Sequence, residues 1–150
     1  MSAPRTPAQE ARTAQVLAAM LETDAFSRWL GIRVVSAGAG RSELHMHIRH
    51  DMVNGFGAAH GGITYSLADS ALAFACNGGE HVTVAVDNQV SYPAPVHVGD
   101  DLVATAEEES RGGRLGFYRV TVRNQHGTVV ALFRGTVYRT STLHPTGPAS

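Results

Sequence analysis

Residues 60–79 read HGGITYSLADSALAFACNGG, in which two glycine pairs enclose an almost wholly apolar segment. A helix with this sequence carries apolar side chains on nearly every side, so the rest of the protein must surround it. A single carboxylate, Asp69, lies in the middle, and the segment contains no Lys or Arg that could pair with it. Because a buried, unpaired carboxylate is costly, the sequence raises the question of what Asp69 does.

Side-chain patterns on both sides of this segment predict further helices and strands. The long helix itself is predicted over about 61–77, and the glycines at 78 and 79 suit its C-terminal stop. Two short helices are expected before it, over 7–21 and 25–30. Alternating or β-branched patterns predict two strands before the long helix and four after it, over 32–38, 41–50, 81–92, 101–110, 115–124 and 128–140.

Consecutive strands joined by short turns imply an antiparallel sheet, and the apolar helix needs a surface that encloses it. The predicted class is therefore α+β, with a curved antiparallel sheet wrapped around one long central helix. A chain of 150 residues suits one compact domain. We expect this domain to occupy residues 7–140, with disordered residues 1–6 before it and a frayed tail at 141–150.

Composition argues against several classes of protein. The net charge of −1 argues against a nucleic-acid partner, which normally requires a strong basic excess. No apolar run is long enough to span a bilayer, and the N-terminus lacks the pattern of a signal peptide, so we expect no membrane association. Cys76 is the only cysteine, which excludes an intrachain disulfide and fits a reducing cytoplasm as the expected location.

A longer motif extends across the start of the long helix. It reads N-G-x4-H-G-G-x4-L-x-D-x-A, and its residues are Asn54, Gly55, His60, Gly61, Gly62, Leu67, Asp69 and Ala71. With this motif and the segments 87–100 and 130–139, the chain resembles the hotdog-fold acyl-CoA thioesterases, most closely those of phenylacetic acid degradation (PaaI-type). The resemblance implies the hotdog fold and hydrolysis of an acyl-CoA substrate to free acid and coenzyme A. It also implies a phenylacetyl or hydroxyphenylacetyl acyl group and no metal or organic cofactor.

The start of the long helix has the chemistry that thioester hydrolysis needs. A helix N-terminus presents free N–H groups and partial positive charge, and Gly61 and Gly62 let a carbonyl approach closely. By the resemblance, the Gly61 N–H polarises the carbonyl, His60 orients the thioester and Asn54 positions the attacking water. Asp69 then acts as general base on water or as nucleophile, and the sequence leaves both roles open.

Gly61 and Asp69 cannot act on one carbonyl from the same helix. Eight residues separate them, which is roughly 12 Å along the helix axis. Antiparallel helices across a two-fold axis would bring Gly61 of one subunit to Asp69 of the other, so we expect a homodimer with composite sites. The resemblance implies the same dimer and a homotetramer of paired dimers. Tyr65 and Ser66 lie on the flank of Asp69 and are expected to line the acyl site or hold the carboxylate.

Several of these residues also have structural interpretations. Asp69 could be a structural carboxylate in a hydrogen-bond network, and Asn54 a turn residue. His45 and His47 share one strand face at a spacing that suits zinc, but no third ligand is evident and a solvated face is favoured. Some arginines are candidates for the coenzyme A phosphates, namely Arg111, Arg114, Arg134 and Arg139. Two other functions stay open: enoyl-CoA hydration or dehydration by another type of hotdog enzyme, and acyl-CoA binding without catalysis.

Overall fold

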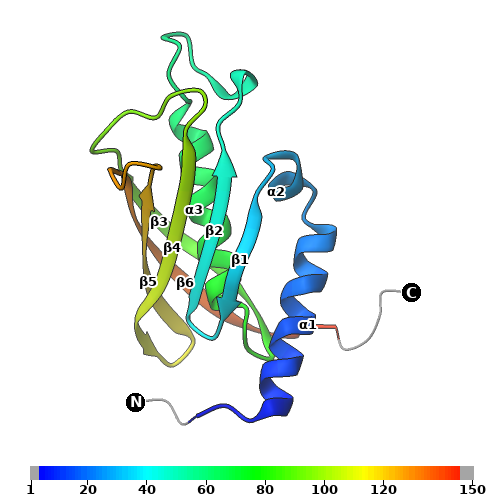
Figure 1. Cartoon of the computed structure of the whole chain (residues 1–150). Helices are drawn as coiled ribbons and strands as arrows, with labels where there is room; N and C mark the ends of the chain where they lie inside the picture. The colour runs from blue at the N-terminus through cyan, green and yellow to red at the C-terminus, as the bar shows by residue number, and fades with distance from the viewer. Residues whose placement is uncertain (1–3, 146–150) are drawn as a thin grey trace.

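A computed structural model describes residues 4–145 of the chain (Figure 1). The elements, in chain order, are α1 (Pro7–Thr23), α2 (Ala25–Trp29), β1 (Arg33–Gly38), β2 (Arg41–His47), a 3-10 turn (His50–Met52), α3 (Gly61–Cys76), β3 (His81–Ser91), β4 (Asp101–Gly112), β5 (Leu115–Arg123) and β6 (Val129–Leu143). In residues 4–145 no helix combines the length and apolar character needed to cross a membrane.

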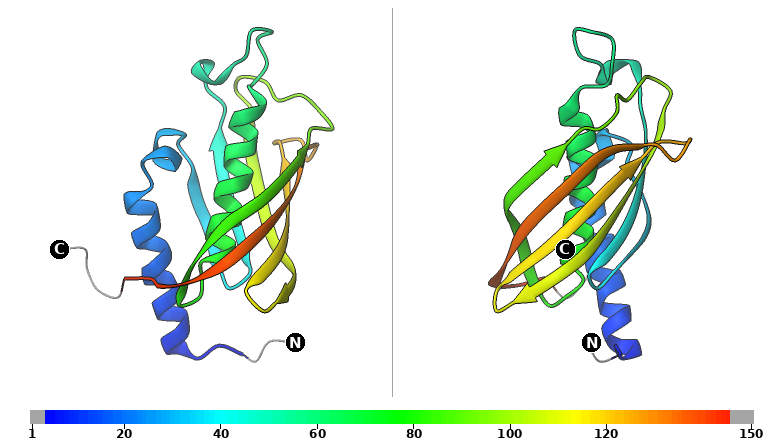
Figure 2. Two further views of the ribbon diagram at one scale, coloured as in Figure 1. Left: turned by 180° about the vertical axis from the view of Figure 1, so that it is seen from behind. Right: turned by 90° about the vertical axis from the view of Figure 1, so that its left-hand side faces the viewer.

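The six strands form one antiparallel sheet in the order β1-β2-β4-β5-β6-β3. The sheet curves around α3, and α1 packs outside it beside β1 (Figure 2). This confirms the predicted α+β class with a central helix enclosed by a sheet. The order leaves β1 and β3 as the two edges, and β3 pairs only with β6.

Most of α3 is buried against the concave face of the sheet. Its buried residues are Thr64, Leu67, Ala68, Ser70, Ala71, Leu72, Phe74, Ala75 and Cys76. The side chains that stay at least partly exposed include Gly62, Ser66, Asp69 and Ala73, at spacings of four, three and four residues. These spacings place the four residues on one side of the helix, which we call the open stripe of α3.

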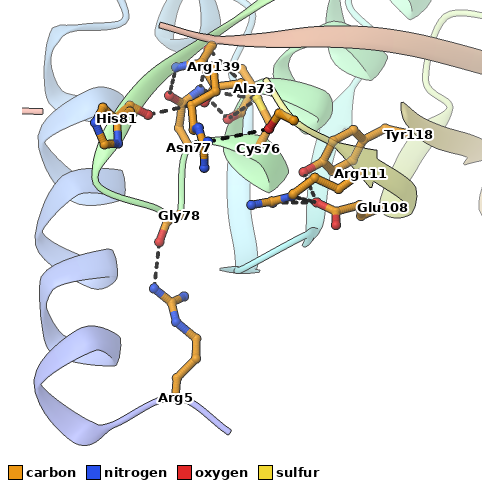
Figure 3. A network of polar contacts seen from close by, with 12 residues as sticks. Arg5, Ala73, Cys76, Asn77, Gly78, His81, Glu108, Arg111, Tyr118 and Arg139 are labelled. Atoms are coloured by element: carbon orange, nitrogen blue, oxygen red, sulfur yellow. Dashed lines mark hydrogen bonds and ion pairs between the residues drawn. The ribbon is translucent and has the colours of Figure 1, made fainter. Parts of the chain in front are cut away.

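The C-terminal end of α3 is closed by Asn77 (Figure 3). The Asn77 side-chain N–H donates to the carbonyl oxygens of Ala73 and Thr83, both at 3.0 Å, and its Oδ1 accepts the Thr83 N–H at 2.9 Å. Neither Gly78 nor Gly79 adopts a positive φ, so the predicted glycine stop does not operate. Instead, Gly78 lets the chain pass close to the β1–β2 turn, because an added Cβ would lie 3.2 Å from the Ala39 nitrogen.

Ordered structure begins before residue 7 and continues past residue 140. The Thr6 side chain caps α1, and the Arg5 guanidinium donates to the Gly78 carbonyl oxygen at 2.8 Å (Figure 3). At the other end, β6 runs to Leu143. The part of the chain that the structure describes therefore extends a few residues beyond the expected domain limits of 7 and 140, while residues 1–3 and 146–150 of the expected disordered start and frayed tail lie outside it.

We predict that Asn77→Ala lowers the free energy of unfolding by about 2 kcal/mol, because the partly buried N–H and carbonyl groups of Thr83 both lose their Asn77 partner. Urea unfolding measures the change. Gln15→Ala removes an amide side chain from an exposed position of α1 and is the matched control, with an expected change within about 0.5 kcal/mol. Equal stability of the two variants would contradict the role of Asn77 as the helix stop.

Candidate active site

The N-terminus of α3 presents one unused backbone donor. His60 is the N-cap residue, and its Nδ1 accepts the Gly62 N–H at 2.9 Å. The Ile63 N–H donates to the His60 carbonyl oxygen, also at 2.9 Å. Within residues 4–145, no acceptor lies in hydrogen-bond geometry with the Gly61 N–H. The positive end of the helix therefore offers the Gly61 N–H to a ligand.

Tyr92 fixes this end of α3 to the segment that follows β3. Its hydroxyl donates to the Gly61 carbonyl oxygen at 2.8 Å. A Cβ on Gly61 would lie 3.2 Å from the Tyr92 ring and hydroxyl, so glycine is the residue that fits this close approach. Tyr92 is not recognisable as a site residue from the sequence, because its partner is a backbone atom 31 residues away.

Asn54 shapes the loop that leads into α3. Its Oδ1 accepts the Phe56 N–H at 2.9 Å, so the structural interpretation as a turn residue applies. An isolated antiparallel bridge pairs Val53 with Ala59, the two residues that adjoin Asn54 and His60. The loop therefore closes on itself and brings Asn54 to the end of the molecule where His60 caps α3.

Asp69 has a neutral partner from the neighbouring strand. The side-chain N–H of Asn88 on β3 donates to Asp69 Oδ1 at 3.0 Å and reaches the Tyr65 hydroxyl at the same distance. Among the ion pairs within residues 4–145, none involves Asp69. An amide from β3, rather than a cation, is thus the partner that the sequence of α3 lacked.

Two opposing effects act on the pKa of Asp69. Burial disfavours the charged carboxylate and raises its pKa above the ordinary value, while the hydrogen bond from Asn88 lowers it, and burial is the larger effect. Asn88 itself is held at a cost, because its Oδ1 is buried and has no hydrogen-bond partner among the described residues. A buried carbonyl oxygen without a donor costs about 1–3 kcal/mol of stability. Asn88 is nevertheless placed so that its N–H binds Asp69.

The predicted site residues fall into two groups along α3. The first group surrounds the helix N-terminus and consists of Asn54, His60, Gly61, Gly62 and Ser66. Ser66 belongs to it because its hydroxyl donates to the Gly62 carbonyl oxygen at 2.6 Å. The second group is Asp69 with Tyr65, joined through Asn88. The eight-residue interval keeps the Gly61 N–H and the carboxylate roughly 12 Å apart along the axis within one chain.

Asn88 is the functional candidate that the sequence analysis missed. The segment DNQVSY was noted only for its family likeness and its strand pattern. An asparagine in a strand otherwise rich in β-branched residues was a usable signal, because asparagine is depleted in strands. Which side chain it would meet depends on the packing of β3 against α3, and local sequence does not give that packing.

Two cavities lie at opposite ends of α3. A cavity of about 330 Å³ adjoins its N-terminus and is lined by His60, Gly62 and Ser66 together with Phe26 and Trp29 of α2. A second cavity, of about 220 Å³, adjoins its C-terminus and is lined in part by the candidate phosphate ligands Arg111, Arg114 and Arg139 and by Cys76. Burial raises the pKa of the Cys76 thiol to about 12, so this cysteine is an inert core residue rather than a nucleophile.

The histidine pair on β2 faces carboxylates rather than a metal. His45 lies 3.1 Å from Glu43, and His47 lies 2.8 Å from Asp101. Over the described residues 4–145, no group of three or more His, Cys, Asp or Glu side chains is arranged to hold a metal ion.

The fold is that of a hotdog-fold thioester hydrolase. The thioesterase superfamily family model matches residues 56–131, which include all of α3 and most of the sheet. The chain belongs to the thioesterase superfamily.

Relatives with assigned names agree with this membership. The chain is 39% identical over 121 residues to the acyl-coenzyme A thioesterase PaaI of Escherichia coli K12, covering 81% of this chain and 86% of that protein. It is 34% identical over 126 residues to human acyl-coenzyme A thioesterase 13, covering 81% and 90%.

Solved structures give the same result. The structure of the Escherichia coli PaaI protein from the phenylacetic acid degradation operon superposes with a TM-score of 0.86 at 36% identity, covering 90% of this chain and 98% of that one. A mutant of the phenylacetic acid degradation protein PaaI from Thermus thermophilus gives a TM-score of 0.74 at 38% identity, with coverages of 78% and 100%.

We predict that Asn88→Ala moves the acidic limb of the profile of kcat/KM against pH to higher pH. The Asn88 hydrogen bond lowers the pKa of Asp69, so removing it raises that pKa further, and a carboxylate that must be ionised is lost earlier as pH falls. Thioester hydrolysis measured across the acidic range gives the limb directly.

The matched control for this experiment is Gln89→Ala, which removes an exposed amide from the next position of β3. Its limb should coincide with that of the unmodified protein. A limb that stays in place in Asn88→Ala, or moves to lower pH, would show that Asn88 does not set the ionisation of the catalytic group.

Proposed function

We propose that this protein is an acyl-CoA thioesterase that hydrolyses aryl-acetyl-CoA, such as phenylacetyl-CoA or hydroxyphenylacetyl-CoA, to the free acid and coenzyme A. The observation that carries the proposal is the pairing of two features on α3. Its N-terminus leaves the Gly61 N–H without an acceptor among the described residues, and its open stripe carries Asp69, a half-buried carboxylate without a cation there. The relatives named as acyl-coenzyme A thioesterases, and the PaaI proteins of phenylacetic acid degradation, support the substrate class.

The carbonyl oxygen of the thioester binds at the Gly61 N–H. There the partial positive charge of the helix N-terminus stabilises the negative charge that develops as the carbonyl carbon is attacked. His60 Nδ1 accepts the Gly62 N–H, so its Nε2 carries the proton of the neutral ring and can donate toward the thioester. Asn54 uses its Oδ1 within the loop, which leaves its side-chain N–H groups to position water.

Asp69 supplies the base or the nucleophile. As a base it takes a proton from water while the water oxygen bonds to the carbonyl carbon, and the carbon–sulfur bond breaks to release the coenzyme A thiolate. As a nucleophile its carboxylate oxygen bonds to the carbonyl carbon, the carbon–sulfur bond breaks to release the coenzyme A thiolate, and water then hydrolyses the resulting anhydride to the free acid. Both routes need the carboxylate ionised, and partial burial makes it more basic than an exposed aspartate.

The complete site requires two subunits. Asp69 hydrogen-bonds to β3, so the open stripe of α3 lies beside that edge strand. The middle of β3 is exposed on both faces, with Val84 and Val86 exposed by 45% and 57%. Pairing of two β3 edges around a two-fold axis covers these valines and sets the helices antiparallel, with Gly61 of one subunit facing Asp69 of the other. By family likeness, two such dimers form a homotetramer.

We predict that Asp69→Asn lowers kcat on phenylacetyl-CoA by about 100-fold or more, because the amide keeps the shape but can neither accept the proton nor attack. A thiol-release assay measures the rate. Asp101→Asn is the control and should retain nearly full activity, because the Asp101 carboxylate is exposed and pairs with His47 rather than with a residue of α3. Near-normal turnover by Asp69→Asn would rule out the proposed role.

The composite site can be tested by mixing two inactive variants. Gly61→Pro removes the N–H at the first helical position, where proline is well tolerated, and its Cβ would lie 3.2 Å from the Tyr92 ring, a half-exposed side chain that can shift to make room. When Gly61→Pro and Asp69→Asn chains are refolded together, half of the dimers should be mixed and each should contain one intact site. We expect about a quarter of the unmodified activity to return.

The outcome depends on where the two groups meet. If each site lies within one chain, no mixture recovers activity above that of the separate variants, and the composite site is wrong. A sizing measurement on the unmodified protein accompanies the assay, and an active monomer would contradict the dimer in the same way.

A further inference from the structure

The short helix α2 is docked directly on the catalytic helix. Asp24 caps α2 by accepting the Ser27 N–H at 2.9 Å and the Ser27 hydroxyl at 2.6 Å. The Ser27 hydroxyl also lies 2.8 Å from that of Ser70, in a buried contact between α2 and α3. Ser70 follows Asp69 in the sequence, so the position of α2 is fixed relative to the proposed active site. Figure 1 shows α2 at the same end of the sheet as the N-terminus of α3.

From this helix two aromatic side chains project into solvent. Phe26 and Trp29 are exposed by 55% and 56%, and their rings stack with centroids 6.1 Å apart and an angle of 23° between planes. The Arg49 guanidinium lies over the Trp29 ring, 5.7 Å from its centroid. Arg49 is itself held by the Leu30 carbonyl oxygen and by Asp51. The two rings are therefore held in place although they are exposed, which indicates that they bind a ligand rather than stabilise the core.

The cavity beside this pair contains the end of the proposed active site. Phe26 and Trp29 line one side of it, and His60, Gly62 and Ser66 line the other. Its volume of about 330 Å³ falls at the lower end of the range of small-molecule sites, about 300–1,000 Å³. His60 and Gly62 flank Gly61 in the sequence, so a carbonyl held at the Gly61 N–H lies at the mouth of this cavity.

We propose that Phe26 and Trp29 bind the aromatic ring of the acyl group and so determine the preference for aryl-acetyl over straight-chain acyl-CoA. This inference rests on the proposed function. In a phenylacetyl thioester one methylene joins the ring to the carbonyl carbon. When the substrate carbonyl binds the Gly61 N–H, the ring therefore lies within this cavity. The adenine of coenzyme A is separated from the sulfur by the long pantetheine arm and cannot occupy the same place when the thioester is bound. Two stacked aromatic side chains favour a planar ring over a flexible alkyl chain.

The first test compares two substrates. The ratio of kcat/KM for phenylacetyl-CoA to that for hexanoyl-CoA is measured in the unmodified protein and in Phe26→Leu and Trp29→Leu, which keep an apolar side chain but remove the ring. We expect the ratio to fall by about three- to ten-fold in each, with hexanoyl-CoA turnover little changed. Trp29→Phe should restore most of the ratio. Phe117→Leu, on the outer surface of β5 and exposed by 41%, is the matched control and should leave it within about two-fold.

The second test does not depend on turnover. Trp29 is the only tryptophan of the chain, so its fluorescence reports this cavity alone. Titration of the Asp69→Asn variant with phenylacetyl-CoA should change the emission, whereas hexanoyl-CoA should change it less and free coenzyme A should leave it unaltered. An equal response to free coenzyme A would place the adenine there and overturn the inference.

The remaining outcomes separate this inference from the function on which it rests. An active protein whose substrate ratio is unaffected by both leucine substitutions refutes the ring-binding role and leaves the thioesterase function standing. If Trp29→Leu keeps the substrate ratio but changes the oligomeric state, Phe26 and Trp29 form a subunit contact, and the ring-binding role is refuted as well. Absence of thiol release from both substrates by the unmodified protein refutes the proposed function instead.

Discussion

The enclosure of α3 by the sheet is the constraint on which the rest of the structure depends. Alanines at 68, 71 and 75 allow the strands to approach the helix closely, while Leu67 and Leu72 fill the space that remains. Each fully buried leucine contributes about 1.5–3 kcal/mol, so a polar group on those faces would weaken the core. Chemistry on this helix is therefore confined to its N-terminus and its open stripe, and that is where Gly61 and Asp69 lie.

The neutral partner of Asp69 suits the role that we propose for its carboxylate. An arginine beside it would lower its pKa and make it a weaker base. With no hydrogen bond at all, burial would favour the protonated form, which can neither accept a proton nor attack. The neutral amide of Asn88 lies between these extremes, since it orients the carboxylate and stabilises its charge only in part. Its own Oδ1 has no hydrogen-bond partner among the described residues, so the amide's contribution here is directed to Asp69 and Tyr65.

Local patterns in the sequence were enough to predict the elements and the class of the fold. The apolar helix, its start at the His-Gly-Gly motif and the hairpin strands all follow from side-chain periodicity and turn residues. The strand order does not follow from these local patterns. β3 pairs with residues of β6 that lie more than 40 positions later, and the residue pattern of β3 does not say which strand it joins. Asn88 and Tyr92 were missed for the same reason, since their contacts with α3 exist only once β3 lies beside it. The glycine stop was wrong because the Asn77 side chain supplies the bonds that a left-handed glycine would otherwise provide.

In the proposed dimer, one partner subunit would cover both of the surfaces that a single chain leaves open, namely the β3 edge and the open stripe of α3. Central strands of the sheet bury alternate residues, as β5 does, whereas β3 exposes residues 84–87 in succession because no described strand pairs with its outer edge. An unpaired edge with exposed valines is an aggregation hazard unless it is covered. The open stripe of α3 lies beside that edge, so a second copy that pairs with β3 would also cover Asp69 and shield it from bulk solvent. A different partner could cover the edge, but only an antiparallel copy of this chain also brings a free helix N-terminus to the carboxylate.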